Sequence, residues 1–177
     1  MPLSQVAQVE KNLKDLSRQV PELPLVESMV LRVAVILGRD LNVLLDGLLK
    51  PAGLAEAEYR VLMALFSHGG SAFAGELCAA LAQSPANLTR VGDALVRQGY
   101  VSRSLDTDDR RKMMLSLEPA GEKLLRSLLP CISSKVASAF EGFTTAEKKR
   151  LLADLKRLLA GIETHTIRDA GSRHKVA

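Results

Sequence analysis

Apolar residues recur at steps of three and four along most of the chain, which is the spacing expected for one face of an amphipathic helix. The helix over residues 25–49 is apolar around more than one face, as is typical of a helix buried on several sides. Proline and glycine breaks separate the periodic segments. The pattern therefore predicts a mainly α-helical protein, with helices over residues 3–20, 25–49, 54–67, 72–82, 84–98, 119–140 and 145–162.

One stretch departs from the helical period. Residues 101–105 and 112–117 are short enough to be strands, and in the second strand every other residue is apolar. The six residues between them, 106–111, are polar or charged and cannot pack into a core. We therefore expect a small β-hairpin with an exposed, charged tip.

The helix over residues 84–98 has clear start and stop signals. Ser84 can cap the free amides of a first turn, Pro85 suits the first helical position, and Gly99 follows the last turn. Only Gln83 separates this helix from the preceding one. Two helices joined so closely, followed by a hairpin, predict a winged helix-turn-helix.

The same helix has two contrasting faces. Leu88, Val91 and Leu95 form an apolar stripe, while small, hydrogen-bonding and cationic residues occupy the opposite side. A face of that kind suits the major groove of DNA, and an arginine at the hairpin tip suits a narrow minor groove. The structural alternative for Arg90 and Arg97 is an ordinary solvated face.

We therefore predict a DNA-binding site on this helix and the hairpin. Ser84 and Thr89 are expected on phosphates or base edges, with Asn87 and Arg90 as candidate base readers. Arg110 or Arg111 is expected in the minor groove, and Asp109 is expected to pair with an arginine and fix its direction. The predicted DNA-binding residues are Ser84, Asn87, Thr89, Arg90, Arg97, Asp109, Arg110, Arg111 and Lys112.

The stretch from Leu54 to Gly121 resembles the DNA-binding lobe of the MarR family of bacterial transcription regulators. SPANLTRVGDALVRQGYVSR resembles the family's recognition helix, and DTDDRRKMMLSLEPAG resembles its wing, with matching marks at Asp106, Asp109, Arg110, Arg111, Leu117 and Gly121. Glu118 departs from the family pattern, which usually has a capping threonine there. The chain looks closest to the branch that represses multidrug efflux operons.

The resemblance implies a helical dimerisation lobe built from the first and last helices. We expect an N-terminal extension and first dimerisation helix over residues 1–53, the DNA-binding lobe over 54–118, dimerisation helices over 119–168 and a disordered tail over 169–177. A symmetric homodimer would select an inverted-repeat operator, with half-sites ~34 Å apart. The apolar stripe of residues 3–20 is expected to pack on a second copy, with its own domain as the alternative.

Regulators of this family often release DNA when a phenolic or lipophilic effector binds between their two lobes. The resemblance therefore implies a homodimeric repressor that responds to a small molecule. Candidate pocket residues are Met29, Val33, Leu37, Met63 and Phe66, although apolar residues at helical spacing are more often ordinary core.

Composition, net charge and the two cysteines further limit the class of protein that the sequence can encode. Apolar residues make up 47% of the chain, but no apolar run is long enough for a membrane span, and we expect a cytoplasmic protein. The net charge of +4 is a mild indication of an anionic partner. Cys78 and Cys131 lack metal-ligand spacing and are expected to be buried thiols, with a redox switch as the alternative.

Two rival functions fit the sequence less well. A winged-helix adaptor that binds protein instead of DNA would have a neutral or acidic recognition face, which Arg90 and Arg97 argue against. An enzyme would need a base or acid motif beside a cysteine, a phosphate loop or a carboxylate pair, and the sequence has none of these. We therefore expect no catalytic activity, no cofactor and no metal.

Overall fold

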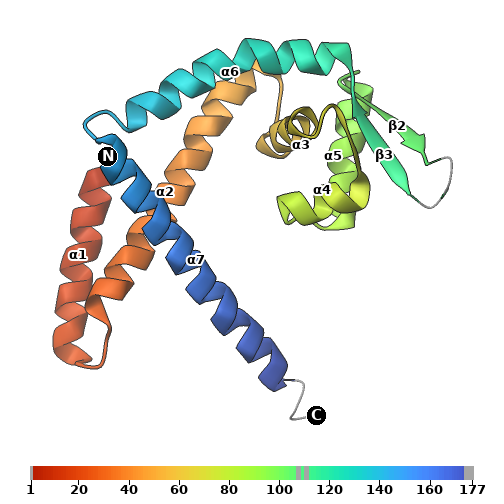
Figure 1. Cartoon of the computed structure of the whole chain (residues 1–177). Coiled ribbons are helices and arrows are strands. Elements are labelled where there is room, and N and C mark those ends of the chain that lie inside the picture. Colours follow the sequence, from red (N-terminus) through yellow and green to blue (C-terminus); the bar gives the residue numbers. More distant parts are fainter. Residues whose placement is uncertain (1, 107–108, 110–111, 174–177) are drawn as a thin grey trace. The chain divides into compact units, whose positions relative to one another are not determined.

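The computed structural model describes residues 2–106, 109 and 112–173 (Figure 1). The structure consists mainly of helices, together with one small sheet, as predicted. They are α1 (Pro2–Gln19), α2 (Leu25–Leu49), the short 3₁₀ helix η1 (Lys50–Ala52), α3 (Glu56–Ser67), β1 (Ser71–Phe73), α4 (Ala74–Leu81), α5 (Pro85–Arg97), β2 (Val101–Leu105), β3 (Met113–Leu117), α6 (Pro119–Ala139) and α7 (Thr145–Arg173). The mainly α fold with a β-hairpin wing is confirmed.

The chain divides into two compact units, residues 1–132 and 133–177, and each is described by itself. The first unit holds α1 to α5, the sheet and most of α6. The second holds the end of α6 and α7. All residues of the predicted DNA-binding site fall within the first unit.

The sheet has three antiparallel strands in the order β1-β3-β2. Leu115 lies at the centre of the sheet, opposite Ala72 on one side and Arg103 on the other. The prediction of one helix over residues 72–82 was wrong at its start, because Ser71–Phe73 forms β1 and the helix begins at Ala74. Three residues are too few to show a strand period, and their partner strand lies about forty residues away in the chain.

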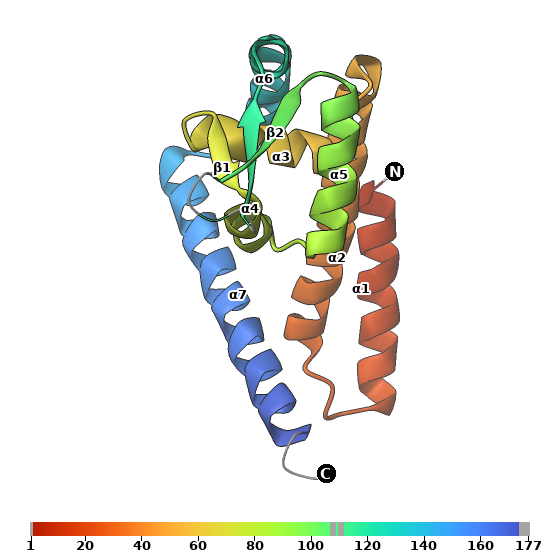
Figure 2. The same cartoon turned by 90° about the vertical axis from the view of Figure 1, so that its right-hand side faces the viewer.

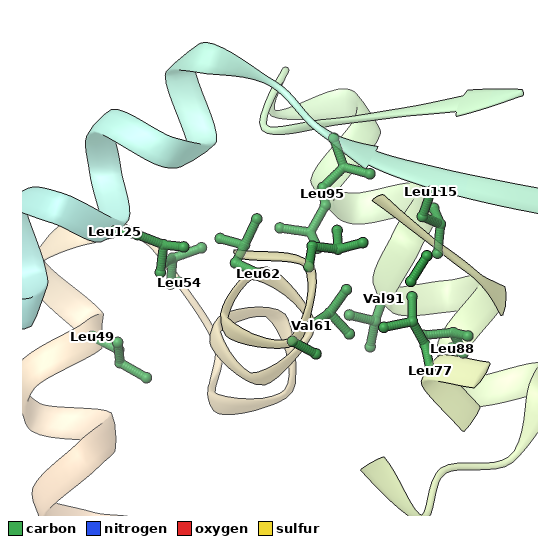
Figure 3. Close-up of a cluster of buried hydrophobic side chains, with 14 of the residues drawn as sticks. Leu49, Leu54, Val61, Leu62, Leu77, Leu88, Val91, Leu95, Leu115 and Leu125 are labelled. Carbon is green, nitrogen blue, oxygen red and sulfur yellow. The ribbon is translucent and has the colours of Figure 1, made fainter. Parts of the chain in front are cut away.

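The core of the first unit lies where α3, α5 and the sheet meet. Figure 3 shows side chains of α5 directed towards those of α3, and Leu125 of α6 closing the cluster beside Leu54. The largest fully buried side chains of the described residues are all leucine or valine: Leu49, Val61, Leu62, Leu65, Leu77, Val91, Leu95, Leu115 and Leu125. Packing of α5 against α3 therefore fixes the rotation of α5 about its own axis.

Gly121 allows the first turn of α6 to pack directly against the backbone of the turn that follows α5. A Cβ at this position would lie 2.5 Å from the carbonyl oxygen of Tyr100, so any side chain would force the two segments apart. The Glu118 backbone N–H donates to the same oxygen at 2.9 Å, and the Glu118 carbonyl accepts from Glu122 N–H at 3.0 Å. These backbone bonds hold the start of α6 at the position where the family pattern has threonine.

Helix α1 packs against α2 of its own chain (Figures 1 and 2). Val6, Val9 and Leu13 are the partly buried residues of the predicted stripe, and the Arg39 guanidinium donates to the Gln5 amide oxygen at 2.8 Å. The stripe thus packs on its own chain, which is the alternative that the sequence left open beside packing on a second copy. A stripe of this kind specifies an apolar partner surface but not the chain that provides it.

The last helix extends further than its sequence signals indicate. Helix α6 has its predicted length and continues through Pro130, whereas α7 continues from the last apolar repeat at Ile162 to Arg173. Residues 169–173 of the expected disordered tail are therefore helical, while 174–177 lie outside the described residues.

Helix α7 begins with a capping box between Thr144 and Glu147. The Thr144 backbone N–H donates to the Glu147 carboxylate at 2.8 Å, the Thr144 hydroxyl donates to it at 2.7 Å, and Glu147 N–H donates back to that hydroxyl at 3.3 Å. The backbone hydrogen bond from Thr144, followed by the hydroxyl bond, lowers the pKa of the Glu147 carboxyl below its ordinary value.

This cap is expected to weaken in acid. Because the pKa of Glu147 is lower in the folded state than in the unfolded state, the cap stabilises the helix above the unfolded pKa. That contribution is lost as the pH falls through the folded value. An NMR titration should show the Thr144 amide shift following the Glu147 carboxyl shift. Glu147→Gln should abolish that titration, whereas Glu163→Gln further along α7 should leave it intact, and an unchanged titration in Glu147→Gln would contradict the assignment.

Candidate nucleic-acid interface

The predicted cap of the recognition helix is present. The Ser84 hydroxyl accepts from Asn87 N–H at 3.3 Å, and Pro85 occupies the first helical position. The preceding turn is held by Gln83 N–H, which donates to the Cys78 carbonyl at 3.0 Å. Because the Ser84 hydroxyl is occupied by the helix end, its contribution is to set where α5 begins. The exposed first turn leaves the Ser84 backbone and the outer side of the hydroxyl facing solvent.

The outer face of α5 is exposed as predicted (Figure 2). Leu88, Val91 and Leu95 are at most 3% exposed, which directs the opposite side of the helix outwards. The exposed residues on that side are Ala86, Thr89, Arg90, Asp93 and Arg97. A smooth, small-residue surface with arginines along it can approach a major groove closely.

Asn87 and Arg90 form a single polar unit on this face. The Arg90 Nη2 donates to the Asn87 amide oxygen at 2.9 Å, so the amide group directs the guanidinium. Asparagine and arginine are the side chains best suited to bidentate hydrogen bonds with adenine and guanine edges. The structure therefore brings together the two residues that the sequence predicted as base readers.

Thr89 and Arg97 are exposed on the same helix. The Thr89 hydroxyl donates to the Pro85 carbonyl at 2.9 Å, and the Arg97 Nε donates to the Asp93 carbonyl at 3.4 Å. Thr89 lies between Asn87 and Arg90 in the sequence, whereas Arg97 is the last residue of α5.

The hairpin stands beside α5, and its stem is well ordered by backbone bonds (Figure 2). Asp106 N–H donates to the Lys112 carbonyl at 3.0 Å, and Lys112 N–H donates to the Asp109 carbonyl at 2.8 Å. The Lys112 ammonium lies 5.8 Å from the centre of the Phe73 ring, a cation–π distance, and it therefore points to β1. Arg110 and Arg111 lie outside the described residues, so their minor-groove role stays a prediction.

Arg103 is the functional side chain that the sequence analysis did not single out. It projects from β2 onto α5, where its Nη1 donates to the Asp93 carboxylate and its Nη2 donates to the Thr89 carbonyl at 2.9 Å. Asp93 is therefore an acceptor for the hairpin rather than simply a member of the outer face. The sequence did contain a signal for this contact, because Asp93 is an acidic residue on a helix face that was expected to meet phosphate and therefore needs a cationic partner.

An apolar cavity of about 230 Å³ lies between α4, the start of α5 and the hairpin. It is lined by Ala74, Gly75, Cys78, Pro85, Leu88, Thr89, Arg103, Met113 and Leu115. Part of the space between the recognition helix and the hairpin is thus not filled by side chains. The Arg103 contacts lie beside this space, while Val101 and Leu115 of the hairpin are buried in the same core as the apolar face of α5.

Some of the residues predicted for an effector pocket pack on the core, and the others are half-buried or exposed on α2. Met63 and Phe66 pack on the core of the first unit, and the Arg126 guanidinium lies 5.1 Å from the centre of the Phe66 ring. Val33 and Leu37 on α2 are exposed by 37% and 52%, and Met29 is half-buried. Met63 also lines a groove of about 470 Å³ on α3 and α4 beside Tyr59, whose pKa is raised by burial.

The cysteines differ from the expected buried thiols. Cys78 is half-buried beside the cavity and Cys131 is exposed on α6. Within the described part of the chain, no group of three or more histidine, cysteine, aspartate or glutamate side chains could hold a metal ion. None of the helices in the described residues is both long enough and apolar enough to cross a membrane.

Comparison with known proteins identifies the family. Residues 52–112 match the model described as MarR family. The transcriptional repressor MprA of Escherichia coli is 27% identical over 156 residues, covering 88% of this chain and 89% of MprA. The HTH-type transcriptional regulator YkoM of Bacillus subtilis is 30% identical over 115 residues, covering 65% of this chain and 73% of YkoM.

Solved structures agree with these relatives. Bordetella bronchiseptica BpsR has a TM-score of 0.62 at 25% identity, covering 72% of this chain and 98% of its own. A mutant MarR of Escherichia coli complexed with operator DNA has a TM-score of 0.66 at 23% identity, covering 72% of this chain and 91% of its own. The chain therefore belongs to the MarR family, and it is a DNA-binding transcriptional regulator with a winged helix-turn-helix fold.

Proposed function

We propose that the protein is a homodimeric repressor that binds an inverted-repeat operator and is released by a small lipophilic or phenolic effector. The observation that carries the DNA-reading part is the Asn87–Arg90 unit, a coupled amide and guanidinium on the exposed face of α5. In this proposal Asn87 and Arg90 read base edges, while Thr89 and Arg97 contact phosphates or neighbouring bases. Arg110 or Arg111, guided by Asp109, enters the minor groove.

Repression and effector release are supported by the relatives. MprA is a transcriptional repressor, and the DNA binding of BpsR is regulated by 6-hydroxynicotinic acid. An effector can weaken operator binding only if it binds more tightly to a conformation that fits the operator poorly. A pocket beside Met63 and Phe66, completed by Met29, Val33 and Leu37, is our proposed location for it.

A homodimer is supported by the apolar surface of α2. One side of this helix carries exposed apolar residues at steps of three or four, the spacing used in helix–helix interfaces. They are Val26, Val30, Val33, Leu37, Leu41 and Leu44. So large an apolar stripe is unusual on a monomeric protein and indicates a surface that another helix covers.

Arg90→Ala is expected to weaken specific binding roughly tenfold or more, because a good base contact contributes about 1–3 kcal/mol of discrimination. The operator is first identified by binding-site selection from random DNA with the purified protein. Fluorescence anisotropy with that duplex and with single-base variants should then show relaxed discrimination at one position per half-site. Arg18→Ala, on an arginine 79% exposed at the end of α1, is the charge-matched control. If the Arg90→Ala variant discriminates against single-base changes at every operator position as well as the unaltered protein does, Arg90 is not a base reader.

Leu41→Glu is expected to convert the dimer into monomers and to reduce operator binding by a large factor. Leu41 is 45% exposed in a single chain, so the substitution should leave the fold of the subunit intact. Val43→Glu is the matched control, since Val43 is 65% exposed and lies on another side of α2. Sedimentation velocity measures the oligomeric state, and an unchanged dimer in Leu41→Glu would exclude this stripe from the interface.

Effector release is tested with the same selected duplex and a panel of lipophilic and aromatic acids, including 6-hydroxynicotinic acid. An effector of the expected kind should lower operator affinity roughly 5- to 150-fold, the range of typical allosteric coupling. Met63→Ala should reduce that effect without changing affinity in the absence of the compound. Equal operator affinity with and without every compound in the panel would count against the proposed class of effector.

A further inference from the structure

Arg103 holds the hairpin to the recognition helix through a two-pronged contact. Its guanidinium donates to the Asp93 carboxylate from one nitrogen and to the Thr89 carbonyl, at 2.9 Å, from another. In an α-helix the carbonyl of residue i points along the axis towards residue i+4, so the Thr89 carbonyl oxygen lies close to Asp93 and both acceptors are within reach of one guanidinium. The planar guanidinium fork can therefore donate to both, and three-quarters of the Arg103 side chain is withdrawn from solvent.

Gly92 provides the space in which this guanidinium lies. A Cβ at position 92 would be 2.5 Å from Nη2 of Arg103 and 3.4 Å from its Cζ. The contact is with the far end of a flexible side chain, so a larger residue could be accommodated by moving Arg103 and without moving the backbone. Gly92 therefore determines where Arg103 can lie rather than whether α5 can form.

The contact between Arg103 and α5 positions both strands of the hairpin, β2 and β3. Arg103 is the central residue of β2 and is paired with the buried Leu115 of β3. On its other side Arg103 borders the apolar cavity, which leaves room for the guanidinium to move. The direction of the guanidinium against α5 is therefore set by the two polar contacts and by the missing side chain at Gly92.

We propose that Gly92 and Arg103 are positioning residues that set the spacing between the recognition helix and the wing. The pair lets α5 and the hairpin tip enter adjoining grooves at the same time. Arg103 does this without contacting DNA, because its guanidinium faces the helix backbone and is neutralised by Asp93. This inference rests on the proposed operator binding, and it assigns a role to two residues outside the base-reading unit.

The test compares Gly92→Ala and Arg103→Ala with the unaltered protein on the duplex recovered by selection. Both variants are expected to bind about tenfold more weakly, the loss expected when a charge-assisted hydrogen bond no longer fixes a contact. At saturating protein, hydroxyl-radical footprinting should lose protection in the minor groove beneath the wing. Dimethyl sulfate protection of guanines in the major groove should persist. Thermal unfolding of Gly92→Ala should be unchanged or occur at a higher temperature, because alanine favours a helix interior over glycine.

A double variant separates positioning from general stability. With Arg103→Ala already present, the space over position 92 is empty, so adding Gly92→Ala should cost no further affinity. Gly75→Ala in α4 is the matched control, since a Cβ there meets nothing within 4 Å. Additive losses in the double variant, or both groove protections falling together with stability, would overturn the positioning role.

The outcome also distinguishes this inference from the proposed function. If the unaltered protein selects no sequence from random DNA, operator binding itself fails. If it selects a sequence and Gly92→Ala binds that sequence with the same affinity and footprint, operator binding stands and the positioning role alone is wrong.

Discussion

Burial of one face of α5 is the constraint on which the rest of the structure depends. Leu88, Val91 and Leu95 pack against α3 and are at most 3% exposed (Figure 3). Each such side chain contributes about 1.5–3 kcal/mol through the hydrophobic effect, far more than any exposed polar contact on the helix. Because residues advance about 100° around a helix, that burial also fixes which residues face outwards. Asn87 and Arg90 read DNA in our proposal because leucine and valine on the other side leave them no alternative orientation.

The same rotation determines a third side of α5, which faces the hairpin. Thr89, Gly92 and Asp93 lie there, and they receive Arg103 rather than an apolar side chain. Hydrogen bonds restrict both the distance and the direction between donor and acceptor, whereas dispersion contacts are not directional, so a polar contact is suited to setting the spacing beside a partly empty cavity. One helix thus carries an apolar side for stability, a polar side for DNA and a mixed side for the wing.

Much of this arrangement could be predicted from sequence, because most of it follows from local periodicity. The cap at Ser84, the bounds of α5, the hairpin strands and the outward face of the helix all appear in the structure as expected. The features that were missed depend on residues distant in the chain. The strand Ser71–Phe73 exists only because β3 pairs with it, and the role of Arg103 exists only because β2 returns to α5. Exposure of Cys131 was missed for a similar reason, since a helical period shows which residues share a face but not whether another element covers it.

The second copy that we propose is consistent with how few cations one subunit directs at DNA. On α5 the cationic side chains are Arg90 and Arg97, and on β2 Arg103 is already neutralised by Asp93, so in our proposal only an arginine of the hairpin tip adds to the two on α5. Affinity for DNA depends strongly on the number of phosphates that are neutralised, so a single lobe with this inventory would bind weakly at physiological salt. Two copies in a fixed relation double the number of contacts, and they also restrict binding to sites whose halves match the spacing of the two helices. In the proposed homodimer the apolar stripe of α2 and the charge pattern of α5 would therefore act together, because a small recognition surface becomes selective when it is duplicated.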